Sequence, residues 1–203
     1  IRDLDAHGFS RVRRWGRGVD TEAYHPRFRP DPRTVALREH LLGDAEVLVG
    51  YVGWLAPEKR VERLAALAHL PNIRIAVVGD GPSRQSVKRA LGPKATLLGR
   101  RSGVELSRAY AAMDVFVHTG TEETFGQTLQ EAMASAVPVV APASGGPIDV
   151  VDNGVTGILF SPDDDTAMTA AVTLLAENPC TRFRMGEAGR RTALGRTWES
   201  VCQ

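Results

Sequence analysis

Cysteine is scarce in this 203-residue sequence, which contains Cys180 and Cys202 and no others. Two cysteines are too few for a disulfide framework, and they lack the Cys-x-x-Cys spacing of many metal and redox sites. Long apolar runs are also absent, because stretches such as 47–55 and 137–143 fall short of the roughly 20 residues that a membrane-spanning helix needs. We therefore expect a protein of a reducing compartment with no metal site and no transmembrane helix.

An excess of charge of either sign is missing as well. The chain has 25 Lys and Arg against 24 Asp and Glu, a formal net charge of +1, which argues against the strongly basic surface of a nucleic-acid-binding protein. Any anionic partner must then be bound by local groups. The sequence begins at Ile1 without a methionine or a signal peptide, so we expect a piece of a longer protein.

Short apolar runs alternate with amphipathic stretches along the chain, a pattern typical of a parallel sheet covered by helices on both faces. We expect strands at 47–51, 73–78, 96–98, 115–117, 137–140 and 157–159. We expect helices at 61–68, 82–91, 104–113, 127–135, 167–177 and 181–194. The predicted fold class is α/β, a doubly wound, Rossmann-like parallel sheet that binds ligands at the carboxyl ends of its strands.

The domain organisation follows from this rhythm. Residues 1–14 do not share it, and the Arg-rich segment 11–14, with prolines at 26, 30 and 32 after it, is typical of an interdomain linker. We expect a nucleotide-binding domain at 15–194 and the start of a truncated C-terminal helix at 195–203. The acidic run 163–165 favours a helix N-cap over a metal site.

Two loops after predicted strands have the composition of a nucleotide site. Gly53 would let the backbone approach a ligand closely, and Lys59 would place an ammonium near a helix N-terminus, which together outline a phosphate site. An ordinary loop with a solvated Lys-Arg pair fits the same residues. After the next strand, Gly79-Asp80-Gly81 lacks the full dinucleotide-binding spacing, and a tight turn explains it equally well.

The strongest pattern lies at 119–134, where Glu123 precedes a predicted helix and Glu131 lies within it. If that helix begins near Gly126, its free N–H groups can bind a diphosphate, while the carboxylates accept hydrogen bonds from vicinal hydroxyls. One ligand with phosphates between two polyols would satisfy all these groups. The alternative is a capped surface helix with solvated glutamates.

The spacing of Glu123 and Glu131 resembles the signature of glycosyltransferase family 4. Further pieces resemble that family in the same order along the chain, at 18–26, 53–59, 143–147, 153–157 and 159–162. The resemblance extends from about residue 15 to residue 194. It implies a retaining glycosyltransferase of the GT-B fold, of which this chain is the C-terminal, donor-binding half.

The resemblance also implies roles for single residues. Glu123 would bind hydroxyls of the donor sugar, Lys59 the diphosphate and Glu131 the ribose, with Glu123 and Lys59 central to catalysis and no metal or cofactor needed. Phe125, Gly126 and Gln127 would supply backbone donors, and Gly53 and Trp54 belong to the phosphate loop.

Two further donor-binding candidates come from the residues themselves. Arg100, after the third predicted strand, could line a base pocket, although Gly-Arg-Arg is also common in surface loops. His118 could contact the sugar or phosphate of the donor, although a histidine at a strand end is as often structural.

One residue departs from the family pattern. Trp54 stands where the family ordinarily has an arginine, and an indole supplies neither the permanent charge nor the bidentate fork of a guanidinium. This departure leaves a second interpretation open, in which the chain binds a donor but is catalytically inactive.

The donor follows from a narrower likeness, to actinobacterial mannosyltransferases of lipid or lipoglycan synthesis. It implies GDP-mannose as substrate and α-mannosyl transfer to a lipid or glycolipid acceptor that the missing N-terminal domain would bind. It also implies a cytoplasmic protein, with peripheral association of the full-length enzyme at the inner face of the plasma membrane. A transferase or an epimerase that uses a UDP-sugar remains an alternative.

Overall fold

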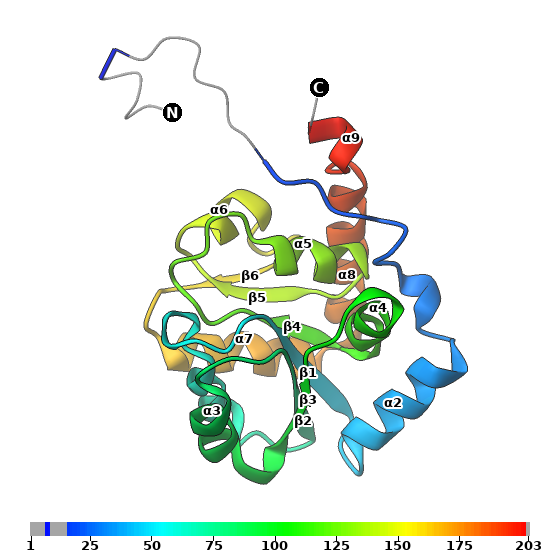
Figure 1. Ribbon diagram of the computed structural model, residues 1–203, viewed down its shortest axis with the longest axis vertical. Coiled ribbons are helices and arrows are strands. Elements are labelled where there is room, and N and C mark those ends of the chain that lie inside the picture. Colours follow the sequence, from blue (N-terminus) through cyan, green and yellow to red (C-terminus); the bar gives the residue numbers. More distant parts are fainter. Residues whose placement is uncertain (1–6, 9–15, 202–203) are drawn as a thin grey trace.

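The computed structural model describes residues 7–8 and 16–201. Its centre is a six-stranded sheet, parallel throughout, with the strand order β3-β2-β1-β4-β5-β6 (Figure 1). The strands are β1 (Val47–Val52), β2 (Ile73–Val78), β3 (Ala95–Gly99), β4 (Val115–Val117), β5 (Val139–Pro142) and β6 (Gly157–Phe160). The predicted doubly wound α/β fold is confirmed. Most of the predicted linker at 1–14 lies outside the described residues.

Helices connect successive strands and cover both faces of the sheet (Figure 1). The α-helices are α2 (Pro32–Leu42), α3 (Arg84–Leu91), α4 (Gly103–Ala112), α5 (Gln127–Ala134), α6 (Gly146–Val150), α7 (Asp165–Glu177), α8 (Pro179–Leu194) and α9 (Trp198–Val201). The 3-10 helices are η1 (Pro26–Phe28), η2 (Pro57–Lys59), η3 (Val61–Leu67) and η4 (Gly92–Lys94).

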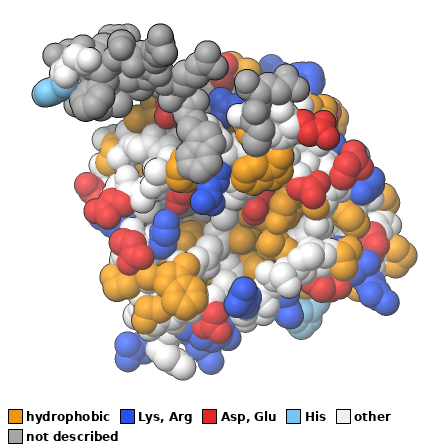
Figure 2. Space-filling view, turned by 45° about the horizontal axis from the view of Figure 1, so that its top comes forward, with side chains coloured by type: hydrophobic (Ala, Val, Ile, Leu, Met, Phe, Trp, Pro, Cys, Tyr) orange, Lys and Arg blue, Asp and Glu red, His pale blue; other side chains and the backbone are white. Residues whose placement is uncertain are grey.

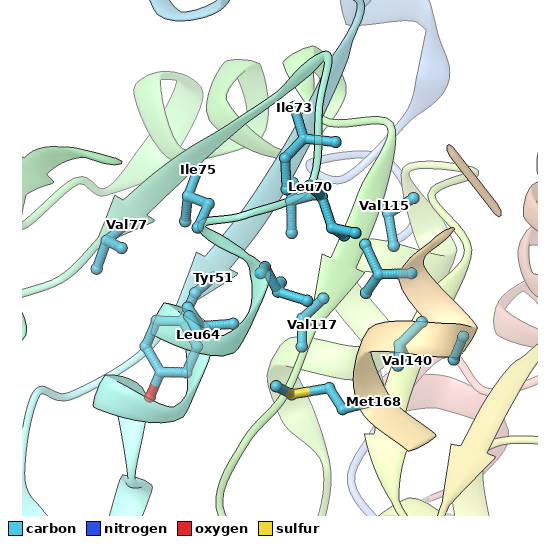
Figure 3. Packing of buried hydrophobic residues seen from close by; sticks show 14 of the residues in the cluster. Tyr51, Leu64, Leu70, Ile73, Ile75, Val77, Val115, Val117, Val140 and Met168 are labelled. Atoms are coloured by element: carbon cyan, nitrogen blue, oxygen red, sulfur yellow. The ribbon is translucent and has the colours of Figure 1, made fainter. Parts of the chain in front are cut away.

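The two faces of the sheet have separate apolar cores, because alternate residues of a strand point to opposite faces. On one face, side chains of β1, β2, β4 and β5 pack against Leu64 of η3 and Met168 of α7, as Figure 3 shows. On the other face, Phe116 of β4 packs in a cluster with Tyr110 of α4 and Leu129 of α5. The packing of Leu129 in this cluster thus fixes the position of α5 on the sheet.

The helix expected at 61–68 is present as the 3-10 helix Val61–Leu67. Two other expectations need correction. β5 begins two residues later than expected, because Ala136 follows α5 in a left-handed conformation at φ 55° and the next N–H, that of Val137, bonds back to the carbonyl of Ala132. Of the prolines assigned to a linker, Pro26 starts η1 and Pro32 starts α2, which packs against α4. Asp164 caps α7 through a hydrogen bond from Ala167 N, as predicted.

The strand order locates the site. Chain connections run outward in both directions from the neighbouring strands β1 and β4, and such a switch point leaves a crevice at the carboxyl ends of the two strands. The loop after β1 carries Gly53 to Lys59, and the loop after β4 carries His118 to Gly126. The two segments are far apart in sequence, with Thr119 and Lys59 separated by 60 positions, and they meet at one edge of the sheet.

Candidate functional site

Lys59 and Glu123 meet directly at this crevice. The ammonium of Lys59 donates to Glu123 Oε2 at 2.9 Å, and the two side chains are 24% and 18% exposed. Burial alone would raise the pKa of Glu123, but the hydrogen bond and charge of Lys59, with smaller contributions from His118 and the N–H of Gly126, lower it. Glu123 is therefore ionised at neutral pH and paired with a cation.

The loops that carry this pair are also joined by a side-chain-to-backbone hydrogen bond and by close approach of their backbones. Thr119 Oγ1 donates to the carbonyl of Lys59 at 2.7 Å, and a Cβ at Gly120 would lie 3.3 Å from Lys59 Cα. Lys59 is the last residue of η2, and Arg60, at φ 52°, separates it from η3. Through its partner Glu123, which accepts from Gly126 N, the ammonium lies near the N-terminus of α5.

The N-terminus of α5 begins where the sequence predicted, with Gly126 at φ 61° as its N-cap. Glu123 Oε1 accepts from the backbone N–H of Gly126 at 3.1 Å and of Phe125 at 3.4 Å. The side chain of Gln127 donates to the carbonyl of Gly18 at 3.3 Å and ties α5 to the segment before η1. The N–H groups predicted to bind an anion at this helix start thus donate to Glu123.

Gly53, Trp54 and Arg100 lie together, as the sequence suggested. They line a cavity of about 400 Å³ between the loops after β1, β2 and β3. Trp54 is 59% exposed at this cavity. Lys59 and Glu123 are not among its lining residues, so the predicted site has two neighbouring parts, this cavity and the charged pair.

The glycines after β2 have a packing role. A Cβ at Gly79 would lie 1.8 Å from the carbonyl oxygen of Gly53, and one at Gly81 would lie 2.3 Å from that of Leu55. Leu55 N in turn donates to the carbonyl of Asp80 at 2.9 Å. Close approach of two loops therefore accounts for the glycines of this motif. Gly79 and Asp80 also line the same cavity as Gly53, Trp54 and Arg100.

His118 lies at the end of β4 and is 2% exposed. Burial lowers its pKa to about 4, with the charge of Lys59 acting in the same direction and that of Glu123 opposing it. Neither ring nitrogen has a hydrogen-bond partner among the described residues. His118 is thus a neutral, buried imidazole beside the charged pair.

Glu131 is held by tyrosines that the sequence analysis did not identify. Tyr110 of α4 donates its hydroxyl to Glu131 Oε2 at 2.8 Å, and Tyr24 meets the ring of Tyr110 edge-on at a centroid distance of 5.5 Å. Burial raises the pKa of Glu131, while hydrogen bonds from Tyr110, Gln127 and Tyr24 oppose that rise. Tyr24 falls within the motif that opens the domain, whereas no sequence signal marked Tyr110.

The loop after β5 supports Glu123 from the other side. Gly146 N donates to the carbonyl of Glu123, and Ser144 Oγ donates to that of Thr121 at 2.9 Å. A Cβ at Gly145, where φ is 61°, would lie 2.5 Å from the same Glu123 carbonyl oxygen. The two adjacent glycines therefore allow the loop to press against the backbone of Glu123.

Charges are interspersed over the face shown in Figure 2, without a large region of one sign. Within residues 7–8 and 16–201, no group of three or more His, Cys, Asp or Glu side chains is arranged to hold a metal ion. None of the helices in this part of the chain is long and apolar enough to cross a membrane.

A family model described as glycosyl transferases group 1 matches residues 33–192, which is well over half of the chain. The chain belongs to this family. The prediction of a glycosyltransferase domain of the GT-B kind is thereby confirmed, and the matched range contains every site residue named above except Gly18 and Tyr24.

Two individual proteins similar to this group 1 glycosyl transferase give further detail. The chain is 49% identical to a GDP-mannose-dependent alpha-mannosyltransferase of Mycolicibacterium smegmatis over 100% of its own length, but spans about half (52%) of that protein. It matches Anabaena HepE, solved in complex with UDP, with a TM-score of 0.83 and 25% identity, covering 98% of this chain and 57% of the other.

A third comparison concerns the fold alone. The C-terminal domain of a glycosyl transferase group 1 family protein from Francisella tularensis (LpcC) matches with a TM-score of 0.70 and 22% identity. The match covers 88% of this chain and 98% of that domain. The described structure thus has the fold of one domain of a larger group 1 transferase.

Proposed function

We propose that this chain is the donor-binding half of a retaining glycosyltransferase that uses GDP-mannose and transfers α-mannose to a lipid or lipoglycan acceptor. The observation that carries the proposal is the meeting of Lys59 and Glu123 at the switch point of the sheet, with Glu131 one helix turn further along α5. The name of the M. smegmatis relative supports GDP-mannose as the donor.

Each group has a place in this proposal. The ammonium of Lys59 and the N-terminus of α5 stabilise the charge that develops on the departing nucleoside diphosphate, in a crevice where fixed charges act strongly. Glu123 accepts hydrogen bonds from the sugar hydroxyls and Glu131 from the ribose. Gly53, Trp54 and Arg100 surround the nucleotide in the adjoining cavity.

Titration calorimetry of the purified chain with GDP-mannose, UDP-glucose and ADP-glucose tests the proposal. We expect GDP-mannose to bind at least about tenfold more tightly than the other two, a difference of about 1.4 kcal/mol. Tighter binding of UDP-glucose would replace the assigned donor. A lack of saturable binding by all three would overturn the donor-binding role.

A donor-binding protein without transferase activity is the second candidate, and Trp54 is the observation that favours it. The test is mannose transfer to lipid by a longer protein that contains this chain and an N-terminal half, compared with the same protein carrying Trp54→Arg. Transfer with tryptophan in place would exclude the inactive candidate. Transfer only with arginine would establish it.

A further inference from the structure

The carboxylate of Glu123 divides its two oxygens between different partners. Oε2 accepts from the ammonium of Lys59 at 2.9 Å, while Oε1 accepts from the N–H of Gly126 at 3.1 Å and of Phe125 at 3.4 Å. These partners are the groups that a diphosphate would use. One carboxylate therefore occupies the groups that would bind the anion.

A diphosphate that approaches Lys59 must compete with this carboxylate. The paired side chains are only 24% and 18% exposed, so the pair is partly withdrawn from water, and separating it leaves a charge without its partner. The diphosphate also brings negative charge close to Glu123. Binding to Lys59 is therefore more favourable when Glu123 receives new hydrogen bonds at the same time.

The loops do not need the ion pair in order to meet. The carbonyl of Lys59 already accepts from Thr119 Oγ1 at 2.7 Å, and the carbonyl of Glu123 already accepts from Gly146 N. The loop after β1 and the loop after β5 are therefore each joined to the loop after β4 through backbone groups. The Lys59–Glu123 contact is free to exchange without separating the loops.

We propose that Glu123 makes the site discriminate between a nucleotide sugar and the free nucleoside diphosphate. The sugar hydroxyls donate hydrogen bonds to Glu123 and replace Lys59 as its partner, and Lys59 then binds the diphosphate. A nucleoside diphosphate without a sugar offers Glu123 no replacement. This inference rests on the proposed function.

The same exchange bears on release of the product. Once the sugar has been transferred, its hydroxyls leave Glu123, which again competes with the diphosphate for Lys59. The affinity of the site for the nucleoside diphosphate falls at that moment. Glu123 thus links sugar recognition to the strength with which the diphosphate is held.

Glu123→Gln tests this proposal with little change in shape. The amide keeps one oxygen for the N–H groups of Phe125 and Gly126 and replaces Oε2 with a donor that cannot pair with an ammonium. Calorimetry should show GDP binding tightened about tenfold, as expected for release of a charge-assisted hydrogen bond. GDP-mannose should gain less or lose affinity, so the preference for donor over GDP should shrink.

Two further variants separate this mechanism from a general charge effect. Glu122→Gln removes the same charge from an exposed neighbouring side chain and should leave GDP affinity unchanged. In a Lys59→Met background, Glu123→Gln should give no gain, because the cation that it would release is absent. Urea unfolding of each variant verifies that all of them are folded.

The possible results distinguish this inference from the proposed function. Unchanged GDP affinity in Glu123→Gln, or an equal gain in Glu122→Gln, would overturn the discrimination while leaving donor binding intact. If neither GDP nor GDP-mannose binds, inorganic pyrophosphate serves as the probe. A gain for pyrophosphate alone in Glu123→Gln would overturn both the proposed function and the discrimination.

Discussion

Trp54→Arg restores the residue type that the family resemblance calls for at the edge of the cavity. Trp54 is 59% exposed, so its replacement removes little buried apolar surface. Substitutions at such positions usually change the free energy of unfolding by less than about 0.5 kcal/mol. Any change in ligand affinity then reports on the site and not on the fold.

The expected gain follows from the charges already present. A hydrogen bond to a charged group contributes about 1.5–3 kcal/mol. The new guanidinium would be partly solvated, and Arg100 and Arg101 already line the same cavity, so we expect about 1–2 kcal/mol. That gain corresponds to GDP binding tighter by about five- to thirtyfold.

Calorimetric titration with GDP at low ionic strength measures this gain, which should shrink as salt is added. Guanosine, which has no phosphates, should bind both proteins equally. Trp54→Gln is the matched control, because it removes the indole without adding a charge. If Trp54→Arg leaves GDP affinity unchanged, the loop after β1 does not bind the diphosphate, and the role of Lys59 falls with it.

Glu131→Gln should weaken GDP and GDP-mannose alike, by about 1–3 kcal/mol in titration calorimetry, since the proposed ribose contact is common to both; a loss confined to GDP-mannose would refute that contact. Tyr110→Phe removes the hydroxyl bound to Glu131 and should lower the free energy of unfolding in urea by about 1 kcal/mol; an unchanged value would show that the bond adds nothing. Because the pKa of His118 is lowered from 6.5 to about 4, the unfolded state binds this proton first, and stability should fall as pH decreases from about 6.5 to about 4. Urea midpoints at pH 7.5 and 5.0 should differ less in His118→Leu than in the unsubstituted chain, and an equal decline in both proteins would rule out His118 as the cause.

The sheet was predictable because its central strands are almost entirely buried and rich in apolar residues, as at 47–52 and, apart from Arg74, at 73–78. Helix α2 was missed because its apolar pattern is weak, with Thr34 and Leu41 as its buried residues. Pro32 follows two other prolines in a pattern typical of a linker, although proline also fits the first turn of a helix. The local sequence pattern thus predicts those elements that bury many apolar side chains in the core.

The sequence predicted several residues of the candidate site but not the contacts between them. Lys59 and Glu123 were each placed after a strand, but their direct pairing depends on β1 and β4 being neighbours, which no local pattern states. Tyr110 lies 21 residues before Glu131 and reaches it through tertiary packing. Motif spacing identified the carboxylates, whereas the groups that hold them came only from the fold.

Amide chemical shifts of the isotopically labelled chain, followed by NMR during titration with GDP, test most directly whether the switch-point crevice is the nucleotide site. We predict saturable chemical-shift changes that are largest at the amides of Gly53, Gly120 and Gly126. The open groove between η3 and α7, lined by Ala66 and Thr169 among others, should be unaffected. Chemical-shift changes that are largest in that groove, with the amide shifts of the crevice unchanged, would contradict the assignment of the nucleotide site.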